Sequence, residues 1–319
     1  MPFTTNARPI AGVFLVLLLS ACSTPQTRAL RSSVPADLPA RAELSDVVFF
    51  PQEEYQCGPA SLAMVLTSNG TKVGPEQLKD DLYIPGKQGS LQIEMLATAR
   101  RYGMVAYVLQ PSLQDVLTEV SSGNPVIVLQ NLGLSWYPLW HFAVVIGYDL
   151  HQEEIILRSG SNQRLVLPFT TFEHTWARSG YWAMLALPPA RLPQTATPEN
   201  FIQSLAALEH SSPNSDIEPA YTAAMQRWPE NLLVKIAAGN HAYNQGKLDL
   251  AQHIFAEATQ QHPDSAAAFN NLAQTLSDSG QHDAALRAIH RAMEIGGPLE
   301  SVMRQTLAEI ERKKRETSK

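Results

Sequence analysis

The spacing of the hydrophobic residues predicts two helices early in the chain. The run CGPASLAMVLTSNG, residues 57–70, carries apolar side chains at helical spacing and ends in an Asn-Gly pair, so it predicts a helix that begins near Cys57. The run SLQIEMLATARRYG, residues 90–103, repeats this spacing, and Ser90 stands where an N-cap is expected. The region from Cys57 to Gly103 is therefore expected to contain two helices.

The pattern then becomes typical of β-strands. Short runs rich in Val, Ile and Tyr predict strands at Met104–Leu109, Pro125–Leu129, His141–Tyr148, Glu154–Leu157, Arg164–Leu167 and Tyr181–Leu187. Turn or helix signals separate these runs from one another. Helices followed by strands predict an α+β domain over residues 43–190, in which the leading helix packs on an antiparallel sheet.

The composition changes after the proline-rich joint LPPARLPQTATP, residues 187–198. Ala, Gln, His and Leu dominate there, and similar residues recur 34 positions apart, which is the period of the tetratricopeptide repeat. The matched pairs are Gly246 and Gly280, Asp249 and Asp283, Ala251 and Ala285, Phe255 and Ile289, and Ala258 and Ala292. These matches favour two good repeats and one degenerate repeat over a plain Ala-rich bundle. Residues 197–312 are therefore expected to form an all-α domain that binds a protein partner.

The first residues predict export. Arg8 precedes an apolar stretch that is too short to span a membrane, and small residues follow, so residues 1–21 are typical of a signal peptide. The segment Leu19–Cys22 resembles the bacterial lipobox, in which the cysteine is diacylated; an ordinary signal peptide with a chance cysteine is the alternative. By resemblance to Gram-negative sorting rules, Ser23 favours the outer membrane, with the protein facing the periplasm. Residues 22–42 are rich in Pro, Ser, Thr and Ala and are expected to be a flexible tether.

Charge and cysteine content narrow the chemistry of the folded part. The formal charge is −6 and basic residues cluster only in the C-terminal ERKKRETSK, so no nucleic-acid partner is expected. The sequence contains no HExxH-like spacing, and neither a metal nor a cofactor is implied. Besides Cys22, Cys57 is the only cysteine, so an internal disulfide is excluded. The thiol of Cys57 is either buried and inert or reactive.

Local features support a reactive thiol. A helix N-terminus favours the thiolate, so the pKa of Cys57 is expected to be lowered, and Gln52 or Gln56 could help to bind an oxyanion. The stretches PQEEYQCGPASLAMVL and WHFAVVIGYD resemble those of the C39 and C39-like peptidases, which are papain-fold cysteine enzymes. The resemblance covers about residues 47–187. It implies that Cys57 is the nucleophile, His141 the general base and Gln52, rather than Gln56, the oxyanion donor.

The third member of the site departs from the family pattern. The resemblance implies an Asp on the strand after the histidine strand, but no acid is found at the expected place. Asp149 follows His141 along the same strand, and at 3.3 Å per residue it would lie roughly 26 Å away. If DLHQE forms the hairpin turn, positions near 159 face His141, so Ser159 is the candidate that orients the imidazole. A neutral serine stabilises an imidazolium less than a carboxylate does.

The sequence leaves three functional hypotheses. The leading one is a lipid-anchored periplasmic cysteine peptidase that hydrolyses a bond of a peptide or protein substrate through a thioester, while the repeats bind a protein partner. The absent acid favours the second, a catalytically weak or inactive peptidase fold that serves as a peptide-binding scaffold. The third is acyl transfer, because an amine can attack the same thioester as water.

Overall fold

The protein, seen in a computed structural model, divides into two compact units, one formed mainly by residues up to Pro188 and one by residues from Ala196 onward. The structure describes residues 24–52, 56–84, 86, 89–213 and 215–317. The predicted signal peptide and Cys22 lie outside the described residues. Among the helices of the described part, none combines the length and apolarity that a membrane span requires.

The first unit contains a seven-stranded sheet that follows the predicted apolar runs. Its strands lie in the order β2-β7-β3-β4-β5-β6, and β1 pairs with β4 outside this path. Their bounds are β1 (Arg41–Glu43), β2 (Val105–Val108), β3 (Val126–Asn131), β4 (Trp140–Asp149), β5 (Glu154–Ser159), β6 (Asn162–Pro168) and β7 (Ala183–Leu187). Each predicted run overlaps a strand and each pairing is antiparallel, so the predicted α+β fold is confirmed.

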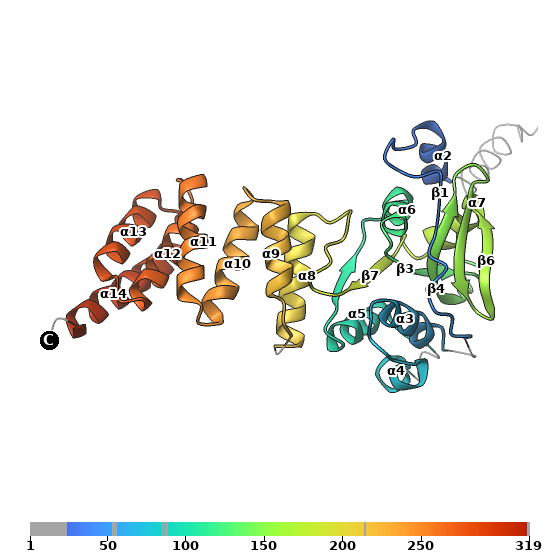
Figure 1. Ribbon diagram of the computed structural model, residues 1–319, viewed down its shortest axis with the longest axis horizontal. Helices are drawn as coiled ribbons and strands as arrows, with labels where there is room; N and C mark the ends of the chain where they lie inside the picture. Colours follow the sequence, from blue (N-terminus) through green and yellow to red (C-terminus); the bar gives the residue numbers. More distant parts are fainter. Residues whose placement is uncertain (1–23, 53–55, 85, 87–88, 214, 318–319) are drawn as a thin grey trace, which may run out of the picture. The chain divides into compact units, whose positions relative to one another are not determined.

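Helices cover both faces of this sheet (Figure 1). One face carries α3 (Cys57–Ser68), α4 (Pro75–Leu82) and α5 (Gln92–Arg101), and the other carries α6 (Leu113–Ser121) and α7 (Phe169–Ala177). Alternate strand residues point to opposite faces, so Phe142 and Val144 join the core formed with α3. The helix α3 is buried from Gly58 to Leu66, which explains why its sequence is apolar on nearly all sides.

The predicted helix starts are correct for α3 and wrong for α5. The first residue of α3 is Cys57, as expected, but α5 begins at Gln92 and has Leu91 as its N-cap. The expected cap Ser90 instead packs against α3, where a Cβ placed on Gly58 would lie only 2.2 Å from the Ser90 Oγ. Close packing of the two segments, rather than capping, therefore fixes Ser90. The helix α4 was not predicted from the sequence.

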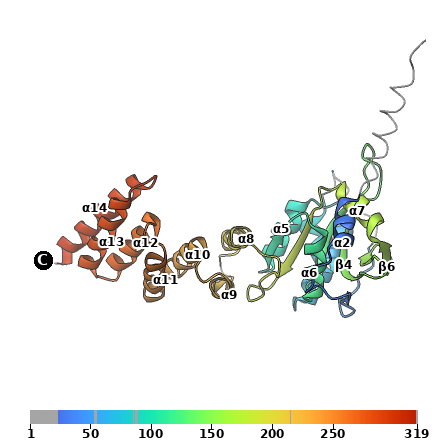
Figure 2. The same cartoon turned by 90° about the horizontal axis from the view of Figure 1, so that it is seen from above.

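The expected flexible tether is largely folded onto the domain. Residues 25–32 form α2 (Pro25–Ser32), which packs against α6 and α7 (Figures 1 and 2). The buried carboxylate of Glu173 accepts hydrogen bonds from the amides of Gln26 and Thr27, at 2.9 and 2.7 Å, and from the Thr27 hydroxyl at 2.6 Å. Leu30 is also buried. Composition predicted a tether because it does not reveal a distant carboxylate that satisfies the first turn of a helix.

The second unit is all-helical, as predicted. Its helices are α8 (Pro198–Ser211), α9 (Glu218–Arg227), α10 (Leu232–Asn244), α11 (Leu248–Gln261), α12 (Ala266–Asp278), α13 (His282–Ile295) and α14 (Glu300–Thr317). The matched glycines Gly246 and Gly280 follow α10 and α12 with positive φ angles of 72° and 77°, which glycine adopts at little cost. A Cβ on Gly239 would lie 2.5 Å from the Phe255 ring, so a small residue is needed for α10 and α11 to pack this closely.

Candidate active site

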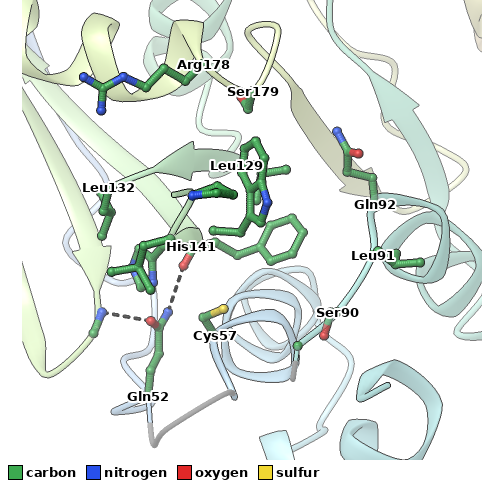
Figure 3. Close-up of a pocket in the computed structure, with 16 residues that line it drawn as sticks. Gln52, Cys57, Ser90, Leu91, Gln92, Leu129, Leu132, His141, Arg178 and Ser179 are labelled. Atoms are coloured by element: carbon green, nitrogen blue, oxygen red, sulfur yellow. Dashed lines mark hydrogen bonds between the residues drawn. The ribbon is translucent and has the colours of Figure 1, made fainter. Parts of the chain in front are cut away.

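A cavity of about 860 Å³ lies where β3 ends and β4 begins (Figure 3). Three sequence-predicted residues line it: Cys57 from the start of α3, His141 from the start of β4, and Gln52 from the segment before α3. The fourth, Ser159, reaches His141 from the end of β5. The fold thus brings together four side chains that lie up to 107 positions apart in the sequence.

Burial determines the charge state of Cys57. The thiol lies partly buried against the core beneath α3, and this burial raises its pKa. Hydrogen bonding to the backbone of Phe142, of Gly58 and of Cys57 itself acts in the opposite direction but has a smaller effect. The expectation that the helix N-terminus lowers the pKa of this thiol is therefore wrong for the resting site. Desolvation raises the pKa of the thiol more than the backbone hydrogen bonds lower it.

His141 is held by Ser159. The His141 Nε2 lies 2.8 Å from the Ser159 Oγ, so Nδ1 is the ring nitrogen that does not take part in this contact. Burial lowers the pKa of His141 to about 4, because charging the desolvated ring is costly. Both Cys57 and His141 are accordingly neutral in the resting site near pH 7.

Backbone hydrogen bonds fix the orientation of Gln52. Its side-chain Oε1 accepts a hydrogen bond from the backbone N–H of Gly160 at 2.9 Å, and the backbone N–H of Gln52 donates to the Gly160 carbonyl at 3.0 Å. Because the oxygen must face this amide, the NH₂ group points the other way, toward the Phe142 carbonyl at 3.3 Å (Figure 3). It also lies 3.2 Å from the Ser61 hydroxyl. Both hydrogen bonds of the NH₂ group are long, so an oxyanion could displace one of them. The alternative candidate, Gln56, is the N-cap of α3 and does not line the cavity.

The carboxylate of Asp149 is used elsewhere, as the strand arithmetic predicted. It ends β4 and accepts hydrogen bonds from the amides of His151 and Gln152, at 2.9 and 3.0 Å, within the turn that leads to β5. The pairing of β4 with β5 runs from Asp149 and Glu154 and shifts between Val145 and Gly147. Among the described residues that line the cavity, none carries a carboxylate.

Arg158 supports the site and was not singled out from the sequence. This buried arginine precedes Ser159 and donates to the carbonyls of Val47, at 2.8 Å, and Ser45, at 3.0 Å. It also donates to the carbonyl of Gln163. These bonds tie the segment that leads to Gln52 onto β5. A single arginine within the apolar run EIILRS was the available signal.

Two family models match parts of this chain. Residues 44–184 match the model of the Peptidase_C39 like family. This region is a C39-like peptidase domain. The matched range includes Gln52, Cys57, His141 and Ser159. Residues 242–298 match the tetratricopeptide repeat. The C39-like domain and the repeats are the two families that the sequence patterns predicted.

Solved structures include relatives of the C39-like domain at low identity. A protein from Bacillus anthracis described as a C39-like peptidase is 22% identical, with a TM-score of 0.40, and the alignment covers 47% of this chain and 98% of that one. The peptidase domain of Streptococcus ComA, a bifunctional ABC transporter of a quorum-sensing pathway, is also 22% identical. Its TM-score is 0.37, with 44% of this chain and 98% of that chain covered. A comparison with curated proteins finds no match.

Proposed function

We propose that the C39-like domain hydrolyses a peptide or amide bond through Cys57 and His141. The observation that carries this proposal is a single cavity that contains the thiol, the imidazole and the Gln52 amide, with His141 Nε2 bonded to Ser159. A nucleophile, a base and the group that orients the base are the parts that covalent acyl chemistry requires. Ser159 occupies the orienting position of this triad.

The proposed reaction starts from neutral partners. The Cys57 thiol passes its proton to His141 Nδ1, and its sulfur attacks the substrate carbonyl carbon. The Cys57 amide and the Gln52 NH₂ group then hold the negative oxygen, once the latter gives up one of its long hydrogen bonds. The imidazolium returns the proton to the leaving amine, which leaves a thioester on Cys57. Water activated by His141 hydrolyses this thioester and restores the thiol.

An electrophilic peptide-like probe tests this proposal. We expect the probe to label Cys57 near neutral pH, with a rate that falls at least about tenfold in His141→Ala, because the thiol loses its proton acceptor. Peptide mapping by mass spectrometry identifies the labelled residue. Labelling at the rate of a free thiol, whatever residue occupies position 141, would contradict the enzyme hypothesis.

A specific observation favours a second candidate, a peptide-binding scaffold with little or no activity. Burial raises the pKa of Cys57 and lowers that of His141 to about 4, and the imidazole is oriented by a serine instead of a carboxylate. All three features disfavour the thiolate-imidazolium pair. A Cys57→Ala variant that retains the cellular role of the protein would support this candidate over hydrolysis.

For the remainder of the chain we propose recruitment and anchoring. The match of residues 242–298 to a protein-interaction repeat supports binding of a protein partner in the second unit. The lipobox-like Leu19–Cys22 supports a lipid on Cys22 and attachment to the outer membrane, facing the periplasm. Metabolic labelling with a fatty acid tests the anchor, since Cys22→Ser should remain unlabelled. Equal labelling of the variant would exclude it.

A further inference from the structure

An exposed apolar hairpin stands beside the cavity. We define the apolar hairpin as residues 132–140, from the residue after β3 to the first residue of β4, with the sequence LGLSWYPLW. Its tip residues Trp136 and Tyr137 are 80% and 73% exposed, and Leu139 is 60% exposed. Large apolar side chains gathered on one exposed segment are unusual in a soluble domain and mark a binding surface.

The backbone of the apolar hairpin is held in place. Leu132 donates to the Leu139 carbonyl at 2.8 Å, and Leu134 donates to the Tyr137 carbonyl at 3.0 Å. The side chain of Asn131 accepts from the Leu139 amide at 2.9 Å, which ties the returning strand to the end of β3. The side chains are therefore displayed by an ordered scaffold, so binding does not have to fix a loose loop.

Two further features preserve this shape. The guanidinium of Arg178, at the end of α7, donates to the carbonyls of Asn131 and Gly133 at 3.2 and 2.6 Å. A Cβ on Gly133 would lie 2.5 Å from the Tyr137 carbonyl oxygen, so the hairpin requires glycine at this position. The sequence thus uses a glycine, an asparagine and an arginine to present apolar groups.

The apolar hairpin is continuous with the cavity. Its residues Leu132, Leu139 and Trp140 line the same cavity as Cys57, and Leu91 lines it from the segment before α5. Among the lining residues that the structure describes, none is a carboxylate or a lysine, and Nη1 of the Arg178 guanidinium donates to two backbone carbonyls. The described walls near the thiol therefore offer mainly apolar contacts.

We propose that the apolar hairpin and Leu91 bind bulky apolar side chains of a peptide next to the bond that Cys57 faces. The inference rests on the proposed function for the identity of that bond, whereas the binding itself requires no catalysis. The occupant is an apolar peptide segment, because the side chains of Leu132, Leu139 and Trp140 reach the cavity. A lipid surface would instead engage the tip residues, of which Trp136 is the most exposed.

Peptide binding to a Cys57→Ala protein tests the inference without relying on turnover. The probes are three fluorescein-labelled peptides of Gly and Ser that differ only in a central pair of residues, Leu-Leu, Ser-Ser or Glu-Glu. Fluorescence anisotropy should give an affinity for the Leu-Leu peptide at least about tenfold above the other two, since each buried leucine contributes favourable transfer free energy. Equal affinities for the three peptides would overturn the inference.

Two leucines of the hairpin form a matched pair of variants. Leu139 lines the cavity and is 60% exposed, whereas Leu134 lies on the same hairpin, is 52% exposed and does not line the cavity. We expect Leu139→Ser to lower the affinity for the Leu-Leu peptide at least about fivefold, and Leu134→Ser to change that affinity less than about twofold. Both side chains are mostly exposed, so thermal melting should show that both variants remain folded. Equal losses in the two variants would contradict a role for the cavity side of the hairpin.

Sedimentation with phosphatidylcholine vesicles tests the alternative that the apolar hairpin binds a lipid surface. The protein used is the non-lipidated Cys22→Ser variant. No sedimentation above background is expected, and Trp136→Ser should leave it unchanged. If the protein sediments, and Trp136→Ser abolishes this while Leu139→Ser leaves peptide affinity intact, the hairpin is a membrane contact and the inference fails. If electrophiles do not label Cys57 in the wild type while the Cys57→Ala protein still prefers the Leu-Leu peptide, the proposed hydrolysis is rejected and the inference stands.

Discussion

At the scale of single residues, desolvation determines the protonation of the candidate site. His141 is neutral near pH 7 because its imidazolium would be buried beside a serine hydroxyl. The pKa of Cys57 rises for the same reason. A substrate carbonyl bound in the cavity can change this balance, because proton transfer creates two opposite charges that stabilise each other in a desolvated space.

The first prediction concerns the stability of the domain in acid. The pKa of His141 is about 4 in the folded protein and about 6.5 in the unfolded chain, so the unfolded chain binds more protons between these values. Stability therefore falls as the pH is lowered through this window. From pH 7 to pH 5 the expected contribution of His141 is a loss of about 2 kcal/mol.

Urea unfolding of the wild type and of His141→Gln at both pH values measures this contribution. Glutamine can still hydrogen-bond to Ser159 but does not titrate, so the variant should lose about 2 kcal/mol less than the wild type. The comparison cancels the titration of the other histidines. Identical losses in the two proteins would show that His141 is not buried in its neutral form.

The second prediction tests Ser159 as the orienting residue. Ser159→Asp places a carboxylate near His141 Nε2, which should raise the pKa of the imidazole above its present value of about 4. The thiolate-imidazolium pair then becomes more accessible, so labelling of Cys57 by the electrophilic probe should accelerate by about tenfold or more. A histidine NMR titration measures the pKa directly.

Ser159→Asn is the neutral control of similar size. It should leave the pKa of His141 near its present value and change the labelling rate little, because it adds no charge. Asp149→Asn should also have little effect, since its carboxylate belongs to the β4–β5 turn. If the Asp and Asn substitutions at position 159 behave alike, Ser159 does not orient the imidazole.

At the scale of the elements, strong hydrophobic patterns were predictable and weak ones were not. Five of the six strand runs and α3 are mainly buried, and a buried element needs apolar residues whatever its neighbours are. The sixth run lies in β6, which is only partly buried. In contrast, α4 has the polar sequence PEQLKDDL and buries only Leu78 and Leu82. Its helical pattern is therefore shorter and weaker than that of α3.

The register of the candidate site was predictable in outline only. Counting from the DLHQE turn placed Ser159 near His141, and the structure brings their side chains to 2.8 Å. The shift in pairing between Val145 and Gly147 was invisible in the sequence, and it changes which backbone positions are opposite one another. The contact still forms because Ser159 follows the Val144–Arg158 pair and so lies diagonally from His141 on the neighbouring strand, within reach of the imidazole.

The third prediction concerns the docking of α2. Glu173 satisfies the first turn of α2, so Glu173→Ala should leave the amides of Gln26 and Thr27 without this acceptor and cost about 2 kcal/mol. Hydrogen exchange of residues 26–32 should then increase strongly while α3 stays protected. Glu173→Gln keeps one acceptor oxygen and should recover part of the protection. Unchanged exchange in Glu173→Ala would show that other contacts hold α2.

At the scale of the whole molecule, the two units should be separable by protease. The fourth prediction is that limited digestion cuts first near residues 188–192, before Thr195, whose amide and hydroxyl both bond to the buried carboxylate of Glu119 at 2.7 Å. That contact ties the later part of the proline-rich joint to the first unit, so the cut should fall before it. Mass spectrometry of the fragments locates the site. First cuts within 231–295 would count against a stable repeat unit.

The last prediction joins the proposed lipid on Cys22 to the docked α2. Three peptide steps separate Cys22 from Pro25, the first residue of α2, and they span at most about 11 Å. A lipid on Cys22 would therefore hold the α2 face of the C39-like domain close to the bilayer.

Fluorophores on single cysteines can measure this distance in lipidated Cys57→Ala protein bound to vesicles with a quencher in the lipid headgroups. The exposed Ala29 of α2 and the exposed Asp80 of α4 lie on helices that cover opposite sides of the domain (Figure 1). We expect a label at Ala29→Cys to be quenched several-fold more than one at Asp80→Cys. The hydrogen bonds from Thr27 to Glu173 hold α2 on the domain, so a lipid next to α2 keeps this side of the domain near the headgroups. Adding Glu173→Ala should reduce the difference, and Cys22→Ser should abolish quenching at both positions. Equal quenching at the two positions while α2 is docked would mean that the anchor lies elsewhere in the chain.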